Sequence, residues 1–123
     1  MTILGFPAEQ KPQEKRCAVL PANVKAYKQL GATVQVQAGI GAHIHISDAE
    51  YVAAGAQVIA AREVLLANAD IVPSLHKLSL DDLNQLKPHA LIISYLDPFN
   101  EKDFVTTLSA KNITSISMEM VPR

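Results

Sequence analysis

Short apolar runs alternate with helix-like segments along the whole of this 123-residue chain. Runs rich in β-branched and aliphatic residues predict strands at residues 2–6, 33–37, 57–59, 70–72, 90–95 and 113–118. Consecutive parallel strands need a crossover connection, and helical crossovers pack on the faces of the sheet. The alternation therefore predicts an α/β fold of three layers, a mainly parallel sheet with helices on both faces, of the flavodoxin-like or Rossmann-like half type.

The predicted helices carry start and stop signals of different strength. Pro21 opens the first helix and Gly31 ends it, while Ser47 and Glu50 form a capping box at the start of the second. The expected helices are residues 21–30, 47–54 and 61–68, one that Ser79 caps and Pro88 prevents from extending, and one that Asn100 caps.

Composition narrows the class of protein. With 49% hydrophobic residues, 19% charged residues and a net charge of −1, the chain has the balance of an ordinary globular domain, and no basic face indicates nucleic acid. No apolar run reaches the length of a membrane span, and the first residues lack the pattern of a signal peptide. Cys17 is the only cysteine, which excludes an internal disulfide. We expect a single cytoplasmic domain over residues 1–123.

Arg16 lies on the segment that connects the first predicted strand to the first predicted helix. Loops at such crossovers often carry the ligand groups of α/β sheets, and a planar guanidinium binds a carboxylate or phosphate through two parallel hydrogen bonds. Arg16 is therefore a candidate anion-binding residue. The alternative from residue type alone is an arginine that is solvated or that pairs with Glu9 or Glu14.

Three motifs, in order, resemble the N-terminal domain of alanine dehydrogenases and of the alpha subunit of proton-translocating NAD(P) transhydrogenase. The first is the opening signature formed by Gly5, Pro7, Glu9, Glu14, Arg16, Ala18, Pro21, Val24 and Gly31. The second, within residues 35–58, comprises Gly39, Gly41, Asp48, Tyr51 and the run Ala54-Gly55-Ala56. The third is the ending Val-Pro-Arg at residues 121–123, which resembles the transhydrogenase form. The resemblance covers the whole chain.

The resemblance implies an NAD(H) cofactor that is shared with a second domain. Members of the family carry the dinucleotide fingerprint G-x-G-x-x-G in that domain, and these 123 residues lack it. Gly39-Ile40-Gly41 is no substitute, because Ile44 stands at the third glycine position. Hydride transfer needs a nicotinamide and its acceptor at near-contact distance. We therefore expect the isolated chain to be inactive and to bind no cofactor tightly.

Two positions favour the transhydrogenase branch of the family. Alanine dehydrogenases have a catalytic Lys just after the fourth strand and a catalytic His at the end of the fifth, and this sequence has His76 and Asp97 there. We expect these two residues to line the cleft; a His76–Asp97 acid–base pair is the alternative. Arg123 coincides with the arginine that lies beside NAD(H) in transhydrogenases. The resemblance thus implies Arg16 and Arg123 as the cofactor-binding residues and no catalytic residue in this chain.

A metal site is a weaker hypothesis. His43 and His45 can present two imidazoles on one side of an extended segment, with His76 or His89 as a third ligand. Two loop histidines without a neighbouring cysteine or carboxylate pair are more typical of solvent-exposed residues, so we expect no metal.

The function predicted from these features is that of the N-terminal domain of a transhydrogenase alpha-like protein. Such a domain forms one wall of an NAD(H) cleft and contributes to hydride transfer with a partner chain that carries the nucleotide-binding domain, peripheral to a membrane transhydrogenase complex and without direct membrane insertion. One alternative is a stand-alone small-molecule-binding or interaction module that kept the fold and lost catalysis, favoured by drift at Gln13, His76 and Asp97. Another is an alanine dehydrogenase-like fragment. Apolar surface left uncovered by the missing second domain predicts a homodimer.

Overall fold

One six-stranded sheet organises the protein, which we describe at residues 2–8, 19–76, 78–95, 109–110 and 112–117 from a computed structural model. The strands are β1 (Ile3–Phe6), β2 (Thr33–Gln37), β3 (Gln57–Ile59), β4 (Ile71–His76), β5 (Leu91–Tyr95) and β6 (Thr114–Ser117). They lie in the order β3-β2-β1-β4-β5-β6, and every hydrogen-bonded pair of neighbours is parallel. The predicted α/β architecture with a parallel sheet is confirmed.

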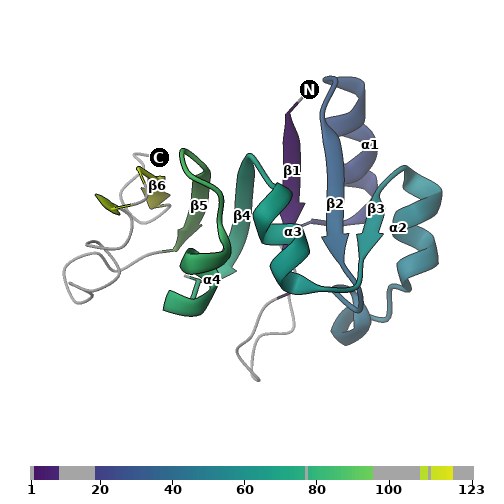
Figure 1. The fold of residues 1–123 in the computed structure, drawn as a ribbon. Helices are drawn as coiled ribbons and strands as arrows, with labels where there is room; N and C mark the ends of the chain where they lie inside the picture. Colours follow the sequence, from purple (N-terminus) through teal and green to yellow (C-terminus); the bar gives the residue numbers. More distant parts are fainter. Residues whose placement is uncertain (1, 9–18, 77, 96–108, 111, 118–123) are drawn as a thin grey trace.

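The strand order reverses between β1 and β4. From β1 the chain moves outward through β2 to β3, crosses back to β4, and continues to β5 and β6 (Figure 1). In open α/β sheets, ligands bind outside the carboxyl ends of the strands at the point where the order reverses. This reversal therefore marks the part of the fold where a functional site is expected.

Helices cover both faces of the sheet (Figure 1). On one face α1 (Pro21–Gln29) contacts α2 (Asp48–Ala54), which follows the short 3-10 helix η1 (Ala42–Ile44). On the other face α3 (Arg62–Asn68) contacts α4 (Leu80–Gln85). None of these described helices is long and apolar enough to cross a membrane. The helix predicted to start at Asn100 lies outside the described residues.

Each face of the sheet has its own hydrophobic core. Phe6 and Val36 pack with Tyr51 of α2 on one face, while Leu65 of α3 packs with Ile92 on the other. Successive side chains of a strand point to opposite faces, so short alternating runs supply both cores at once. The three-layer arrangement follows from this division of the apolar residues.

Side-chain caps fix the starts of α2 and α4 as the sequence predicts. The Ser47 hydroxyl accepts a hydrogen bond from the Glu50 amide at 3.4 Å, and the Glu50 carboxylate accepts one from the Ser47 amide at 2.7 Å. Ser79 and Asp82 form the same reciprocal box, with distances of 3.1 and 3.2 Å. Gly55 ends α2 with φ of 113°, a conformation that favours glycine.

The fourth strand is longer than predicted. The expected strand at residues 70–72 stops before Pro73, because proline cannot donate to a sheet ladder. In the structure β4 continues to His76, with a register shift between Pro73 and His76. Proline is tolerated there because β4 pairs with β1 only at Ile71, so the β1 side of Pro73 is already free of the ladder. His76 therefore ends the strand instead of following it.

Candidate functional site

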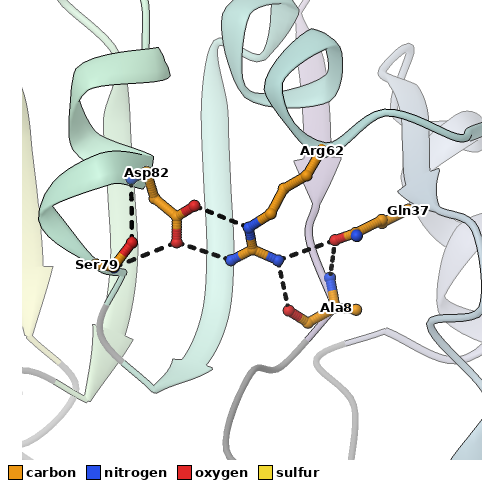
Figure 2. A network of polar contacts seen from close by, with 5 residues as sticks. All are labelled: Ala8, Gln37, Arg62, Ser79 and Asp82. Atoms are coloured by element: carbon orange, nitrogen blue, oxygen red, sulfur yellow. Dashed lines mark hydrogen bonds and ion pairs between the residues drawn. The ribbon is translucent and has the colours of Figure 1, made fainter.

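Four polar or backbone groups meet at the carboxyl edge of the sheet, around the reversal between β1 and β4 (Figure 2). Ala8 follows β1, Gln37 ends β2, Arg62 opens α3 after β3, and Asp82 lies in the first turn of α4 after β4. Because parallel strands place all their carboxyl ends on one edge, residues separated by up to 74 positions come together here.

The guanidinium of Arg62 is the centre of this network. Its Nε donates to Asp82 Oδ1 at 2.8 Å and one Nη donates to Asp82 Oδ2 at 2.9 Å, so the pair is bidentate. The other Nη donates to the Ala8 carbonyl at 2.7 Å and to Gln37 Oε1 at 2.9 Å. The two charged side chains are mostly buried, 17% exposed for Arg62 and 7% for Asp82. Burial makes each of these contacts stronger than it would be in water.

The charge of Asp82 is stabilised by its surroundings. Burial on its own raises the pKa of the Asp82 carboxyl, but the hydrogen bonds and positive charge of Arg62 oppose it. Hydrogen bonds from the backbone and hydroxyl of Ser79 act in the same direction, and the net effect is a lowered pKa. Asp82 is therefore a carboxylate at neutral pH, and it is hydrogen-bonded to Arg62 and to the Ser79 amide at the start of α4.

Ala8, the last described residue before the segment that contains Arg16, is held on both sides. Its amide donates to Gln37 Oε1 at 2.8 Å, and its carbonyl accepts from Arg62. At the other end of residues 9–18, the buried hydroxyl of Tyr51 donates to the Val19 carbonyl at 2.8 Å. Side chains from β2, α2 and α3 thus hold Ala8 and Val19, the described residues on either side of that segment.

The site residues predicted from the sequence are only partly within the described structure. Arg16, Asp97 and Arg123 lie outside the described residues. The backbone of His76 ends β4 at the carboxyl edge, paired with Tyr95 of β5. The predicted meeting of His76 with Asp97 stays a prediction, as do the cofactor roles of Arg16 and Arg123.

The glycine turn after β2 is closed by an acidic side chain. The Gly39 amide donates to Asp48 Oδ1 at 2.9 Å, so a group within the chain already occupies this amide. An open hollow lies beside it, lined by Gly39, Ala42, His45, Ile46, Ser47 and Asp48. His45 is exposed and ends η1 with φ of 60°. Among the described residues, no group of three or more His, Cys, Asp or Glu side chains is placed to hold a metal ion.

Sequence reasoning did not find Arg62, Gln37 or Asp82 as site residues. Arg62 carries one available signal: a cation in the first turn of a helix is opposed by the helix dipole, which indicates that an acidic partner compensates it. The identity of that partner depends on the packing of α3 beside α4, and no local pattern gives it.

Comparisons with known proteins agree on one family. Residues 5–123 match the profile of the family described as alanine dehydrogenase/PNT, N-terminal domain. The chain is 31% identical over 119 residues to an alanine dehydrogenase of Methanococcus maripaludis, covering 97% of this chain and 32% of that protein. It is 30% identical over 125 residues to the first part of NAD(P) transhydrogenase subunit alpha from Rhodospirillum rubrum, covering 98% of this chain and 33% of that protein.

Solved structures give the same result. The transhydrogenase from Sinorhizobium meliloti superimposes with a TM-score of 0.89 at 31% identity, over 98% of this chain and 36% of that one. An L-alanine dehydrogenase superimposes with a TM-score of 0.87 at 24% identity, over 94% of this chain and 32% of that one. This similarity shows that the two share the fold. The chain spans about a third of the length of the curated relatives it matches.

Proposed function

Because this chain belongs to the alanine dehydrogenase/PNT N-terminal domain family, we propose that it forms one wall of an NAD(H) cleft. In this proposal it takes part in hydride transfer only together with a nucleotide-binding domain, as in a transhydrogenase alpha subunit. The observation that carries the proposal is the family match over residues 5–123. The polar network at the strand-order reversal supports it, since ligands of such sheets bind at that edge.

The described residues fit one wall of a dinucleotide site better than a complete site. The Gly39 amide donates to Asp48, and the Arg62 guanidinium donates to Asp82. Both groups are therefore already hydrogen-bonded within the chain and do not form a binding site for a pyrophosphate. The G-x-G-x-x-G fingerprint that normally binds it is absent from these 123 residues. We therefore assign the pyrophosphate to the nucleotide-binding domain and an anionic group of the nucleotide or substrate to Arg16 and Arg123.

When bound, NAD(H) supplies the hydride, and the role of this chain is to orient and enclose the reacting groups. Arg16 would bind an anion through its planar guanidinium, since the strand that precedes it in the sequence, β1, ends at the carboxyl edge of the sheet. His76 and Asp97 would line the cleft. The pure chain would then give no turnover between NADH and an NADP analogue.

Identity to relatives does not separate the two branches of the family, at 31% for an alanine dehydrogenase and 30% for a transhydrogenase subunit. We propose the transhydrogenase branch because His76 and Asp97 stand where the resemblance places the catalytic Lys and His of alanine dehydrogenases. A transhydrogenase does not need those groups, since its second substrate is a nucleotide.

A titration of the full chain with NADH tests the proposal. We expect weak binding that Arg16→Lys abolishes without a change in melting temperature, because Lys keeps the charge but loses the bidentate fork. Lys15→Gln is the matched control, since it removes a positive charge from the adjacent position and should leave binding unchanged. Binding that survives in Arg16→Lys, with a lowered melting temperature, would make Arg16 a structural residue and contradict the proposal.

A further inference from the structure

The outer side of the layer formed by α1 and α2 carries small apolar side chains (Figure 1). Val24 is the buried residue of α1, and Tyr51 is the buried residue of α2. Successive residues of an α-helix are rotated by about 100°, so the residues two positions before and after a buried one point to the outer side. On both helices these positions are exposed alanines, which together we call the alanine patch: Ala22, Ala26, Ala49 and Ala53.

The two helices that form the alanine patch carry opposite charges. The charged side chains of α1 are Lys25 and Lys28, and those of α2 are Asp48 and Glu50. Lys28 Nζ donates to the Gly55 carbonyl at the end of α2 at 3.2 Å, so Lys25, one turn earlier, lies on the side of α1 that faces α2. Lys25 and Glu50 are exposed, and neither belongs to the described ion pairs. The patch is therefore basic along one helix and acidic along the other.

A surface with this charge pattern is complementary to a second copy of itself. Each of the two helices connects a pair of parallel strands, so α1 and α2 run in the same direction. A two-fold axis that lies in the contact plane along the helices places α1 over α2 of the second copy, and Lys25 then faces Glu50. An axis across the helices places α1 over α1 of the second copy, and Lys25 then faces a second Lys25. Because like charges in a contact are unfavourable, the charges favour the first arrangement.

The layer on the opposite face of the sheet lacks this complementarity. Arg62 is the basic residue of α3 and α4, and it is mostly buried in its ion pair with Asp82. The exposed charged residues of the two helices are Glu63 on α3 and Asp81 on α4. Either two-fold arrangement of this layer would therefore bring carboxylates together.

We propose that the alanine patch is the contact surface of a two-fold dimer, in which α1 of each chain packs on α2 of the other. Alanines let the two helix layers approach closely, and the pairs of Lys25 with Glu50 set which helices meet. The contact of two short helices is a modest interface, with a dissociation constant on the order of micromolar. Because the axis runs along the helices, the carboxyl edges of the two sheets lie on the same side of the dimer. This inference does not depend on the proposed function.

Sedimentation velocity of the full chain tests the position of the contact. We expect the wild type to be mostly dimeric at about 100 μM. Ala53→Arg places a long cation against the basic helix α1 of the second copy, so the dissociation constant should rise at least about tenfold. Ala67→Arg is the matched control, because Ala67 is an exposed alanine of α3 on the opposite face, and it should leave the dissociation constant unchanged.

Three results would overturn the inference. They are a wild-type chain that stays monomeric at this concentration, a dimer that Ala53→Arg leaves intact, and an equal loss of association in Ala53→Arg and Ala67→Arg. Circular dichroism spectra of both variants show whether they are folded. If Ala53→Arg does not fold, substitutions of the exposed charges decide.

Reversal of the charges tests which helices meet. Lys25→Glu places a carboxylate opposite Glu50 and should raise the dissociation constant of the dimer at least about tenfold. Adding Glu50→Lys should restore association, because opposite charges face each other again. The Ser47 hydroxyl still caps α2 in that variant, since it accepts from the backbone amide of residue 50. If the double variant stays as monomeric as Lys25→Glu, or if Lys25→Glu associates like the wild type, the pairing of α1 with α2 is wrong and the inference is overturned.

Discussion

The absence of a side chain at Gly5 allows α3 to pack closely against the sheet. Gly5 lies inside β1 between two residues that face the core under α1 and α2, so it faces α3. A Cβ atom at Gly5 would lie 2.7 Å from the Ala69 Cβ and 3.2 Å from Leu65 Cδ2. The first distance is a clash with an atom that cannot rotate away.

We expect Gly5→Ala to lower the free energy of unfolding by about 1–3 kcal/mol, the cost of overpacking a core. Chemical denaturation measures this loss. The double variant with Ala69→Gly should recover some of it, because the contact is between the two Cβ atoms. A fully stable single variant would show that α3 can move away freely.

Two aspartates make the stability of the fold sensitive to acid. For Asp70, the hydrogen bond from Lys87 and then the hydrogen bond from the Ile3 amide lower the pKa of the carboxyl. For Asp82, burial raises the pKa, but Arg62 and Ser79 lower it by more. A folded-state pKa below the unfolded one means that the carboxylate stabilises the fold above the unfolded pKa. This stabilisation is lost as the pH falls toward the folded-state pKa.

The melting temperature should therefore decline as the pH falls below about 4, near the ordinary pKa of aspartate. Thermal melts at a series of pH values measure the decline. Asp82→Asn should be less stable at neutral pH and should flatten the acid side of the curve, whereas Asp81→Asn at the exposed neighbouring position should leave the curve as it is. If the melting temperatures of Asp82→Asn and of the wild type declined equally as the pH falls, the coupling of the Asp82 carboxylate to Arg62 would be contradicted.

At the level of elements, a tyrosine ties α2 to the chain before α1. Tyr51 is fully buried in the core between these helices and β2, and its hydroxyl donates to the carbonyl of Val19, which is also fully buried. A buried carbonyl that loses a donor loses hydrogen-bond energy that offsets its desolvation. The hydroxyl therefore contributes to stability beyond the packing of the ring.

Tyr51→Phe should lower the free energy of unfolding by about 1–3 kcal/mol, since the ring stays packed while the Val19 carbonyl loses this donor. Urea denaturation measures the change. Tyr27→Phe is the control: the Tyr27 ring stacks on Phe6 with centroids 5.9 Å apart, and the substitution keeps that contact. Similar losses in both variants would show that the Val19 contact adds nothing specific.

The elements were predictable from the sequence to the extent that their signals are local. Alternating apolar runs predict the strands, and the capping box at Ser47 and the cap at Ser79 predict where α2 and α4 begin. β4 runs past Pro73 because its neighbour β1 has stopped pairing there, which depends on the register between two strands. Arg62 and Asp82 meet because α3 and α4 pack side by side, and that contact has no signature in either segment alone.

At the scale of the whole molecule, apolar residues remain exposed. Leu30 at the end of α1 is 84% exposed and Val52 on α2 is 54% exposed, so the outer side of this helix layer carries uncovered apolar surface. Apolar surface of this kind is expected to be buried against a second copy of the chain.

We therefore expect self-association, most simply into a two-fold dimer. Sedimentation velocity over a range of concentrations measures it. A modest interface of roughly micromolar affinity would be largely occupied at about 100 μM chain. Monomers alone at that concentration would contradict this expectation.

The central claim is that the carboxyl edge of the sheet, at the reversal between β1 and β4, is the face that meets the nucleotide. Chemical-shift mapping of the labelled chain during an NADH titration tests it most directly. We predict that the largest changes fall on amides of that edge, including Ala8, Leu78 and Ser79, and that they disappear in Arg16→Lys. Largest changes at the amino edge instead, around Asp70 and Ala90, would contradict the claim.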